Sequence, residues 1–148
     1  MILVSACLLG VECKYNGTSN YNPDLIAYLQ NKKWIPICPE QLGGLTTPRI
    51  PAEIQGGDGK DVLSGRARVV TKEGKDVTEA FIKGAKEVLK IAQLANVEEA
   101  ILKERSPSCG KCQIYDGSFQ GKIKPGQGVT AAILREYGIR VKTEEDLY

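Results

Sequence analysis

Short apolar runs alternate along this chain with segments whose apolar residues recur at helical spacing. The runs at residues 2–6, 34–38, 99–103 and 139–141 have the length of β-strands. Between the first two runs, Asn22-Pro23 offers an N-cap followed by a proline at the first helical position. A strand, a helix and a second strand in this order predict a βαβ unit with parallel strands.

The second half of the chain repeats this alternation. Asp76-Val-Thr-Glu79 has the pattern of a capping box, with Asp in the usual Ser/Thr place, and opens a helix predicted to reach residue 94. Gly126-Gln-Gly128 leads into a helix predicted over 129–137, which Gly138 closes. The order of elements predicts an α/β fold: a doubly wound, mainly parallel sheet of about four strands with helices on both faces.

Residues 39–65 differ from the rest of the chain because they are rich in Gly and Pro and lack periodicity. A segment of this length without periodicity is uncommon in a compact domain, and we expect a long functional loop that covers the substrate. Residues 66–71 predict a short strand. The sequence contains no internal repeat, low-complexity tract or linker, so we expect a single domain spanning 1–148.

Composition narrows the possible partners. The net charge of +2 falls short of the basic footprint of a dedicated nucleic-acid binder, so nucleic acid is not an expected partner. No apolar run approaches the ~18 residues that a membrane span requires. The first residues lack the basic stretch and apolar length of a secretory signal, so we expect a cytoplasmic protein. The sequence does not predict the oligomeric state.

The chain has five cysteines and no histidine. In a reducing cytosol, cysteines more often bind metals or take part in catalysis than form disulfides. Cys7 and Cys38 end predicted strands, and Cys109 follows a third. The carboxyl ends of parallel strands form the ligand-binding crevice of an open α/β sheet, so these thiols should converge. Three thiolates without imidazole favour a soft metal or an iron–sulfur cluster, with buried structural thiols as the alternative.

The other two cysteines allow an alternative metal site. Cys13 lies in the loop after Cys7 and could reach the same crevice. Cys112 forms a C-x-x-C pair with Cys109, a spacing found in zinc and redox motifs. An alternative to a catalytic centre is therefore a structural zinc domain, an interaction module in which Cys7, Cys38, Cys109 and Cys112 form a closed site.

A carboxylate and two serines are candidates for acid–base chemistry. Glu40 follows Cys38 by two residues, and its carboxylate should share the crevice. Because the chain has no histidine, a carboxylate is the obvious general base. Ser106 and Ser108 flank Cys109 and could hydrogen-bond sulfur or substrate, although loop serines often only satisfy backbone groups.

Candidate substrate-binding residues are less sharply defined. Arg49 lies between two prolines and could anchor an anionic or carbonyl-rich ligand. Tyr15, Tyr115 and Phe119 could provide stacking faces for a ring, although aromatic residues more often belong to the core. Gly126-Gln-Gly128 before a helix suggests a phosphate loop, but Gly-x-Gly alone is a weak fingerprint and follows no clear strand.

Several motifs, in this order and nearly end to end, resemble the thiouracil desulfidase family, long catalogued as a domain of unknown function. The most specific are Cys38-Pro-Glu40 and Ser106-Pro-Ser-Cys-Gly110. The others are Ser5-Ala-Cys-Leu-Leu-Gly10, Gly43-Gly-Leu45, Pro48-Arg-Ile-Pro-Ala-Glu53, Asp76-Val-Thr78, Ile114-Tyr-Asp-Gly117 and Gly128-Val-Thr-Ala-Ala132.

The resemblance implies a metal-binding enzyme with a [4Fe–4S] cluster held by Cys7, Cys38 and Cys109, whose fourth iron is open to the sulfur of the substrate. It implies non-redox C–S cleavage that turns a small thiolated pyrimidine, thiouracil, into uracil and sulfide. Cys13 precedes Tyr15-Asn-Gly17, where Asn16 replaces the family's usual Asp, and we do not expect Cys13 to be a ligand. A desulfidase acting on thiolated tRNA is a further alternative, weakened by the near-neutral charge.

Overall fold

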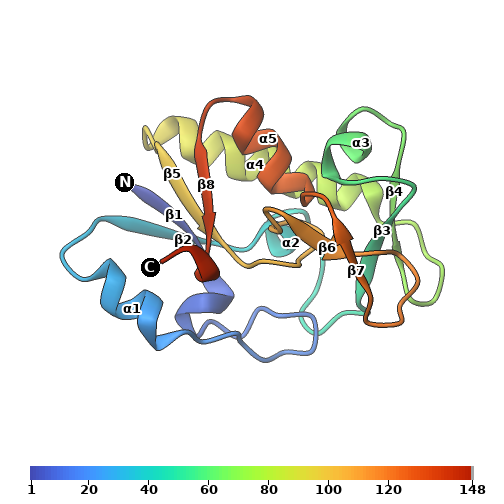
Figure 1. Cartoon of the computed structure of the whole chain (residues 1–148), viewed down its shortest axis with the longest axis horizontal. Coiled ribbons are helices and arrows are strands. Elements are labelled where there is room, and N and C mark those ends of the chain that lie inside the picture. The colour runs from blue at the N-terminus through green and yellow to red at the C-terminus, as the bar shows by residue number, and fades with distance from the viewer. Residues whose placement is uncertain (148) are drawn as a thin grey trace.

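A parallel sheet of four strands lies in one half of the structure, on the left in Figure 1. In spatial order the strands are β2 (Trp34–Ile37), β1 (Ile2–Ser5), β5 (Glu99–Leu102) and β8 (Arg140–Thr143). The computed structural model describes residues 1–147. All four strands predicted from the sequence are present, with ends that differ by one or two residues.

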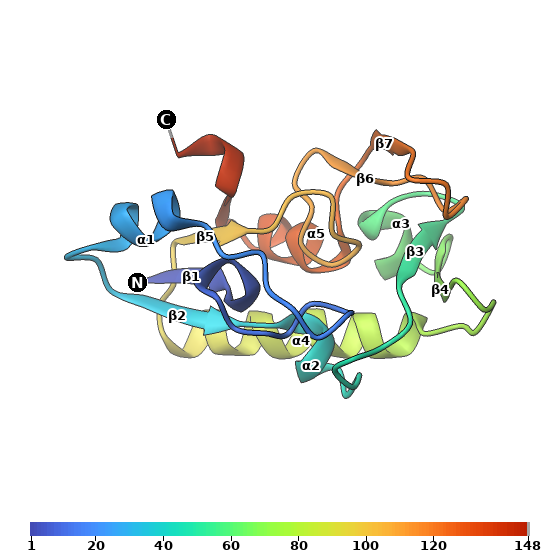
Figure 2. The same ribbon diagram turned by 90° about the horizontal axis from the view of Figure 1, so that it is seen from below.

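Helices cover both faces of this sheet. Successive residues of each strand point to opposite sides, so each strand has apolar side chains to bury on both faces. Val4 and Ile101 pack on one face against α1 (Pro23–Leu29). Leu3 and Leu102 pack on the other face, where α4 (Thr78–Leu94) and α5 (Val129–Glu136) lie (Figure 2). The doubly wound α/β prediction is confirmed. None of the helices within 1–147 has the length and apolar character to cross a bilayer.

The helix starts show where local sequence signals act. The Asn22 side chain accepts a hydrogen bond from the Leu25 N–H at 3.1 Å, and Pro23 follows it, as predicted for α1. The capping box predicted at Asp76 is wrong. Asp76 still belongs to an extended segment, bridged to Val70, so the helix begins only after Val77 and the Asp76 carboxylate accepts the Thr78 N–H instead.

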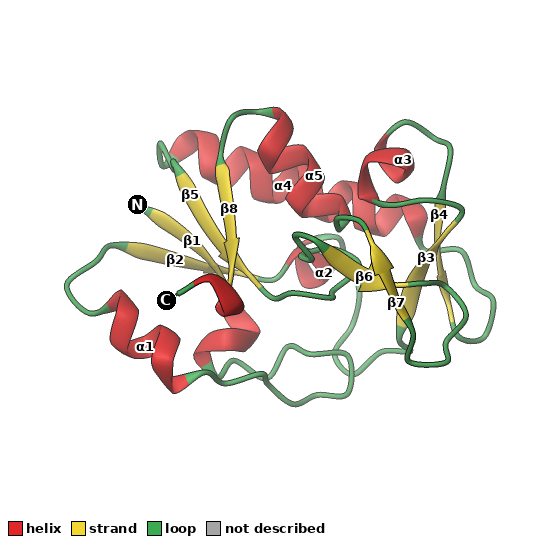
Figure 3. Cartoon of the chain, in the orientation of Figure 1, coloured by secondary structure: helices red, strands yellow, loops and turns green. Residues whose placement is uncertain are grey.

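Residues 39–65 are not the continuous loop expected from their composition. They contain α2 (Pro39–Leu42), β3 (Ala52–Gln55) and α3 (Gly59–Leu63). The strand predicted at 66–71 is present as β4 (Arg68–Thr71), and it pairs with β3 in an antiparallel hairpin. A second hairpin joins β6 (Gln113–Tyr115) and β7 (Ile123–Pro125), and Figure 3 shows both hairpins beyond one end of the parallel sheet.

Close backbone contact fixes α2 on α4. A Cβ atom on Gly43 would overlap the Ala80 carbonyl, and a Cβ on Gly84 would overlap the Pro39 carbonyl. The two glycines therefore allow the helix backbones to touch. Since α2 begins immediately after Cys38, this contact also sets the position of that thiol.

Candidate active site

A cavity of about 750 Å³ opens where β1, β2 and β5 end. Ser5, Ile37 and Lys103, at or next to the carboxyl ends of these three strands, all line it. Residues of both hairpins, including Glu53 and Tyr115, line the opposite side. The crevice expected at the carboxyl edge of the sheet is therefore present, and the hairpins enclose it.

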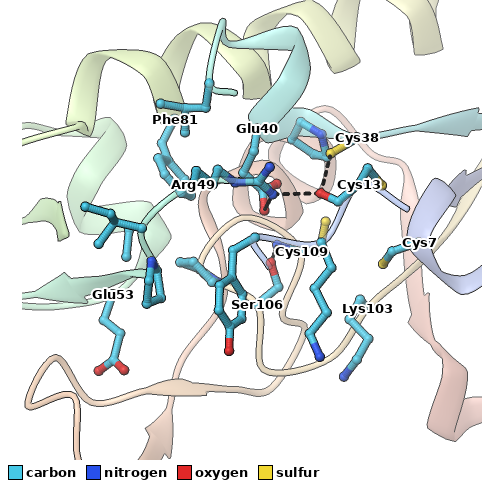
Figure 4. Close-up of a pocket in the computed structure, with 18 of the residues that line it drawn as sticks. Cys7, Cys13, Cys38, Glu40, Arg49, Glu53, Phe81, Lys103, Ser106 and Cys109 are labelled. Atoms are coloured by element: carbon cyan, nitrogen blue, oxygen red, sulfur yellow. Dashed lines mark hydrogen bonds and ion pairs between the residues drawn. The ribbon is translucent and has the colours of Figure 1, made fainter. Parts of the chain in front are cut away.

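Three separate segments bring Cys7, Cys38 and Cys109 to this cavity (Figure 4). Cys7 lies in the short 3₁₀ helix η1 (Ala6–Leu9) that follows β1, and Cys38 is the N-cap residue of α2. Cys109 lies in the loop between β5 and β6 and is buried. The structure thus brings together the three cysteines that sequence analysis selected.

Polar groups donate hydrogen bonds to two of these sulfur atoms. Asn20 Nδ2 lies 3.4 Å from the Cys7 sulfur, and Ser5 Oγ lies 3.4 Å from the Cys109 sulfur. Ser108 Oγ is also within 3.6 Å of Cys109 Sγ. Burial raises the pKa of the Cys109 thiol, and the nearby Glu40 carboxylate raises it further. Donors of this kind are typical partners of metal-bound sulfur.

Cys13, which sequence analysis expected could reach the crevice, is buried and lines the same cavity. Interactions with the thiols of Cys38 and Cys7 are the main causes that raise its own pKa. A hydrogen bond from Cys13, helped by Asn20 and opposed by burial, lowers the pKa of Cys7 to about 7. The pKa of Cys38 is lowered mainly by the same donor, and that of Cys13 is raised. Its six-residue spacing from Cys7 was the only sequence signal for this position.

Cys112 does not join the other cysteines. Its side chain is exposed and does not line the cavity, so the closed zinc site with Cys7, Cys38, Cys109 and Cys112 is not assembled. Within residues 1–147, no group of three or more Cys, Asp or Glu side chains is arranged to hold a single metal ion. The zinc alternative is therefore wrong.

The predicted acid–base residues form a connected chain. Ser108 Oγ donates a hydrogen bond to Glu40 Oε1 at 2.6 Å, and Ser106 Oγ lies 3.1 Å from Ser108 Oγ. Arg49 Nη2 lies 3.4 Å from Glu40 Oε2 and donates to the Cys13 carbonyl at 2.9 Å. Arg49 lines the cavity, as expected of a substrate-binding residue, but its guanidinium is also committed to orienting Glu40.

Aromatic rings form part of the cavity wall. Tyr15, Tyr115 and Phe119 all line it, as their proposed stacking role requires. Phe119 lies in the β6–β7 turn, whose N–H groups at Gly117 and Phe119 donate to Glu53 Oε1 at 2.9 and 3.1 Å. Sequence analysis missed this function of Glu53, because the contact joins residues more than sixty positions apart.

The Gly126-Gln-Gly128 segment is not a phosphate loop. A Cβ atom on Gly128 would collide with the backbone of Ser108, so this glycine is required by close backbone contact. At the start of α5, the N–H groups of Val129 and Thr130 donate to the carbonyls of Pro107 and Ser108 at 2.9 and 2.8 Å. The helix start is thus occupied by the loop that carries Cys109.

Comparison with known proteins assigns the family. The 2-thiouracil desulfurase family matches residues 2–146. The chain belongs to this family. The "Uncharacterized protein YbbK" of Bacillus subtilis (strain 168) is 51% identical over 147 residues, which cover 99% of this chain and 97% of that protein.

The chain is also similar to a solved structure, which is described as "[4Fe-4S]-dependent thiouracil desulfidase TudS". It shares 42% sequence identity with a TM-score of 0.86, and the match covers 99% of this chain and 91% of that one. The family expected from the sequence motifs is confirmed.

Proposed function

We propose that this chain is a [4Fe–4S]-dependent desulfidase that removes sulfur from a small thiolated pyrimidine such as thiouracil. The observation that carries the proposal is the convergence of Cys7, Cys38 and Cys109 beside the Glu40–Ser108 pair in one cavity. Membership of the 2-thiouracil desulfurase family and the similarity to TudS support it. The cavity is within the size range of small-molecule sites.

The donor set of the cavity fits an iron–sulfur cluster. Cys7, Cys38 and Cys109 supply thiolates without histidine, and Asn20 and Ser5 donate to their sulfur atoms. The thiols come from three different segments that meet at one cavity. When bound through three cysteines, such a cluster supplies an open iron, a Lewis acid toward the thiocarbonyl sulfur.

The protein's own residues would then activate the attacking water and transfer protons. In the net reaction the oxygen of one water replaces the sulfur at the ring carbon, and sulfur leaves as sulfide without any change in oxidation state. Glu40 is placed to take a proton from the attacking water, and Ser108, 2.6 Å away, can pass protons between Glu40 and Ser106. Arg49 holds the second oxygen of Glu40, which fixes the direction in which the first one points.

The substrate and compartment follow from the same cavity. Tyr15, Tyr115 and Phe119 offer ring faces against which a planar pyrimidine can stack. We place the protein in the cytoplasm, because free thiols that hold a cluster require reducing conditions. The net charge of +2 favours a small molecule over thiolated tRNA as substrate.

Metal and sulfide analysis under strictly anaerobic conditions tests the proposal. Reconstituted protein should be brown, hold about four iron and four sulfide per chain, and release sulfide from thiouracil. Cys7→Ser, Cys38→Ser and Cys109→Ser should each lose the iron, whereas Cys13→Ser and Cys112→Ser should keep it. Colourless protein with stoichiometric zinc, or a full cluster without any turnover of thiouracil, would contradict the proposal. Turnover of thiolated tRNA without turnover of thiouracil would identify thiolated tRNA as the substrate instead.

A further inference from the structure

A buried carboxylate with no part in the proposed chemistry joins the two ends of the loop that carries Cys109. Glu104 is only 5% exposed. Its Oε1 accepts hydrogen bonds from the N–H groups of Lys111 at 2.7 Å and Cys112 at 3.2 Å, beyond the cysteine. The same atom accepts the N–H of Arg105 at 3.3 Å and that of Gln113 at 3.4 Å. One oxygen atom thus accepts hydrogen bonds from both ends of the loop.

The backbone at the start of this loop has an unusual conformation. Arg105 has a φ of +69°, a left-handed conformation that non-glycine residues rarely adopt. The N–H groups of Lys111 and Cys112, just before β6, both donate to the buried Glu104 carboxylate, and hydrogen bonds to a charged acceptor are stronger than those to a neutral one. The Glu104 carboxylate is their common acceptor.

Glu104 is itself fixed from outside the loop. Its main-chain N–H donates to Glu144 Oε1 at 2.8 Å, and its carbonyl accepts Lys103 Nζ at 2.9 Å. Lys103 and Glu144 also form an ion pair at 3.0 Å. Glu144 belongs to the C-terminal 3₁₀ helix η2 (Glu144–Asp146), which thereby ties the end of β5 to the end of the chain's last strand.

We infer that Glu104 is the positioning residue that holds Cys109 and Ser108 in place for the cluster and for Glu40. This inference rests on the proposed function. Ser108 must reach Glu40 at 2.6 Å while the neighbouring Cys109 presents its sulfur to the cavity. Both requirements are met by one loop geometry, and the Glu104 carboxylate sets that geometry. Mutation of residues that orient metal ligands typically changes metal affinity by ~10–100-fold.

Glu104→Gln tests the inference, because Gln keeps the size of the side chain but its neutral oxygen accepts the N–H groups more weakly. In the cluster-loaded protein, iron release to an excess of chelator should be about 10–100-fold faster than in the wild type. In the cluster-free protein, amide hydrogen exchange at Lys111 and Cys112 should speed up. Glu145→Gln is the matched control, since it removes only the exposed ion pair to Arg105 in the same loop.

Iron release and amide exchange at wild-type rates in Glu104→Gln would overturn the inference. So would equal effects of Glu104→Gln and Glu145→Gln, which would indicate a general effect of charge. Loss of the cooperative thermal transition of cluster-free Glu104→Gln would assign Glu104 to overall stability and overturn the local role. Wild-type protein that holds no iron would contradict the proposed function, while amide exchange in that protein would still decide the role of Glu104.

Discussion

Glu40 has two neighbours that decide what its carboxylate can do. Ser108 donates to one oxygen and Arg49 lies beside the other, so the carboxylate faces the cavity in a fixed direction. Cys38-Pro39 precedes it, and because proline fixes φ, the backbone is held close to the cysteine. An acid–base residue therefore lies next to a proposed cluster ligand in both sequence and space.

Glu40→Gln should abolish most turnover while the cluster stays bound. Gln keeps the size of Glu40 and can still accept from Ser108, but it cannot take a proton from water. Loss of a positioned general base typically costs ~10²–10⁴-fold in rate. The measurement is sulfide release per iron-loaded chain, with Glu73→Gln, in the exposed turn after β4, as the control. Near wild-type turnover in Glu40→Gln would contradict the role of Glu40 and make Ser106 or Ser108 the next candidate for the proton transfer.

The thiol of Cys7 should ionise near neutral pH in the cluster-free protein. A hydrogen bond from Cys13 lowers the pKa of Cys7 from 9.0 to about 7, which means that the thiolate forms at lower pH. Alkylation of Cys7 by iodoacetamide, followed by peptide mass spectrometry, should therefore rise with pH through a midpoint near 7. Cys13→Ala removes the donor and should move this midpoint toward 9.0. An unchanged midpoint in Cys13→Ala would show that another group lowers the pKa.

Among the elements, the β6–β7 hairpin closes the cavity on the side away from the cysteines. Glu53, on β3, accepts two N–H groups of its turn, and Gln55 Nε2 donates to the Gly117 carbonyl at 2.9 Å. The aromatic wall formed by Tyr115 and Phe119 therefore depends on strand β3 for its position. Figure 4 shows Glu53 on the far side of the cavity from Cys7.

Glu53→Gln should weaken substrate binding more than it slows chemistry. The neutral side chain holds the two N–H groups less firmly, so the turn that carries Phe119 loosens while Glu40 and the cysteines keep their places. We expect KM for thiouracil to rise about 5–10-fold, equivalent to ~1–1.4 kcal/mol, and kcat to change little. Steady-state kinetics on iron-loaded protein decides this. A fall in kcat with unchanged KM would assign Glu53 to the chemistry instead.

Local signals predicted the strands of the parallel sheet and strand β4, but not the other elements that enclose the site. Asn22-Pro23 marks the start of α1 by itself, since the cap and the proline act within one turn. Strand β3 could not be recognised in the same way, because its partner β4 lies beyond a further helix and only the pairing makes it a strand. A helix as short as α2 shows no periodicity.

The same distinction applies to the site residues. Cys7 and Cys38 could be selected because each ends a strand, and strand ends share one edge of the sheet. The burial of Cys13, the Arg49–Glu40 ion pair and the contacts of Glu53 depend on how distant segments pack. No spacing in the sequence encodes those contacts.

At the scale of the whole molecule, the proposed cluster would connect the segments that follow β1, β2 and β5, because each of them carries one of its three cysteine ligands. A group that binds only the folded state stabilises it, by ~2.7 kcal/mol when present at 100 times its dissociation constant. At this chain length that corresponds to a rise in Tm of about 5–10 °C. Anaerobic calorimetry should show this difference between loaded and cluster-free protein. Cys13→Ser should preserve the difference and Cys109→Ser should abolish it, and a wild-type Tm that is the same in both forms would contradict a cluster held by three segments.

The loop of Cys109 is held by α5 and η2, both of which follow it in the chain. During synthesis, Cys7 and Cys38 leave the ribosome long before Cys109, and the residues that hold the third thiol in place emerge later still. A nascent chain therefore offers an incomplete set of ordered ligands until α5 and η2 have also emerged. A cluster held by all three thiols would then be acquired only after the segments from β1 to η2 have come together, so that folding precedes metal loading.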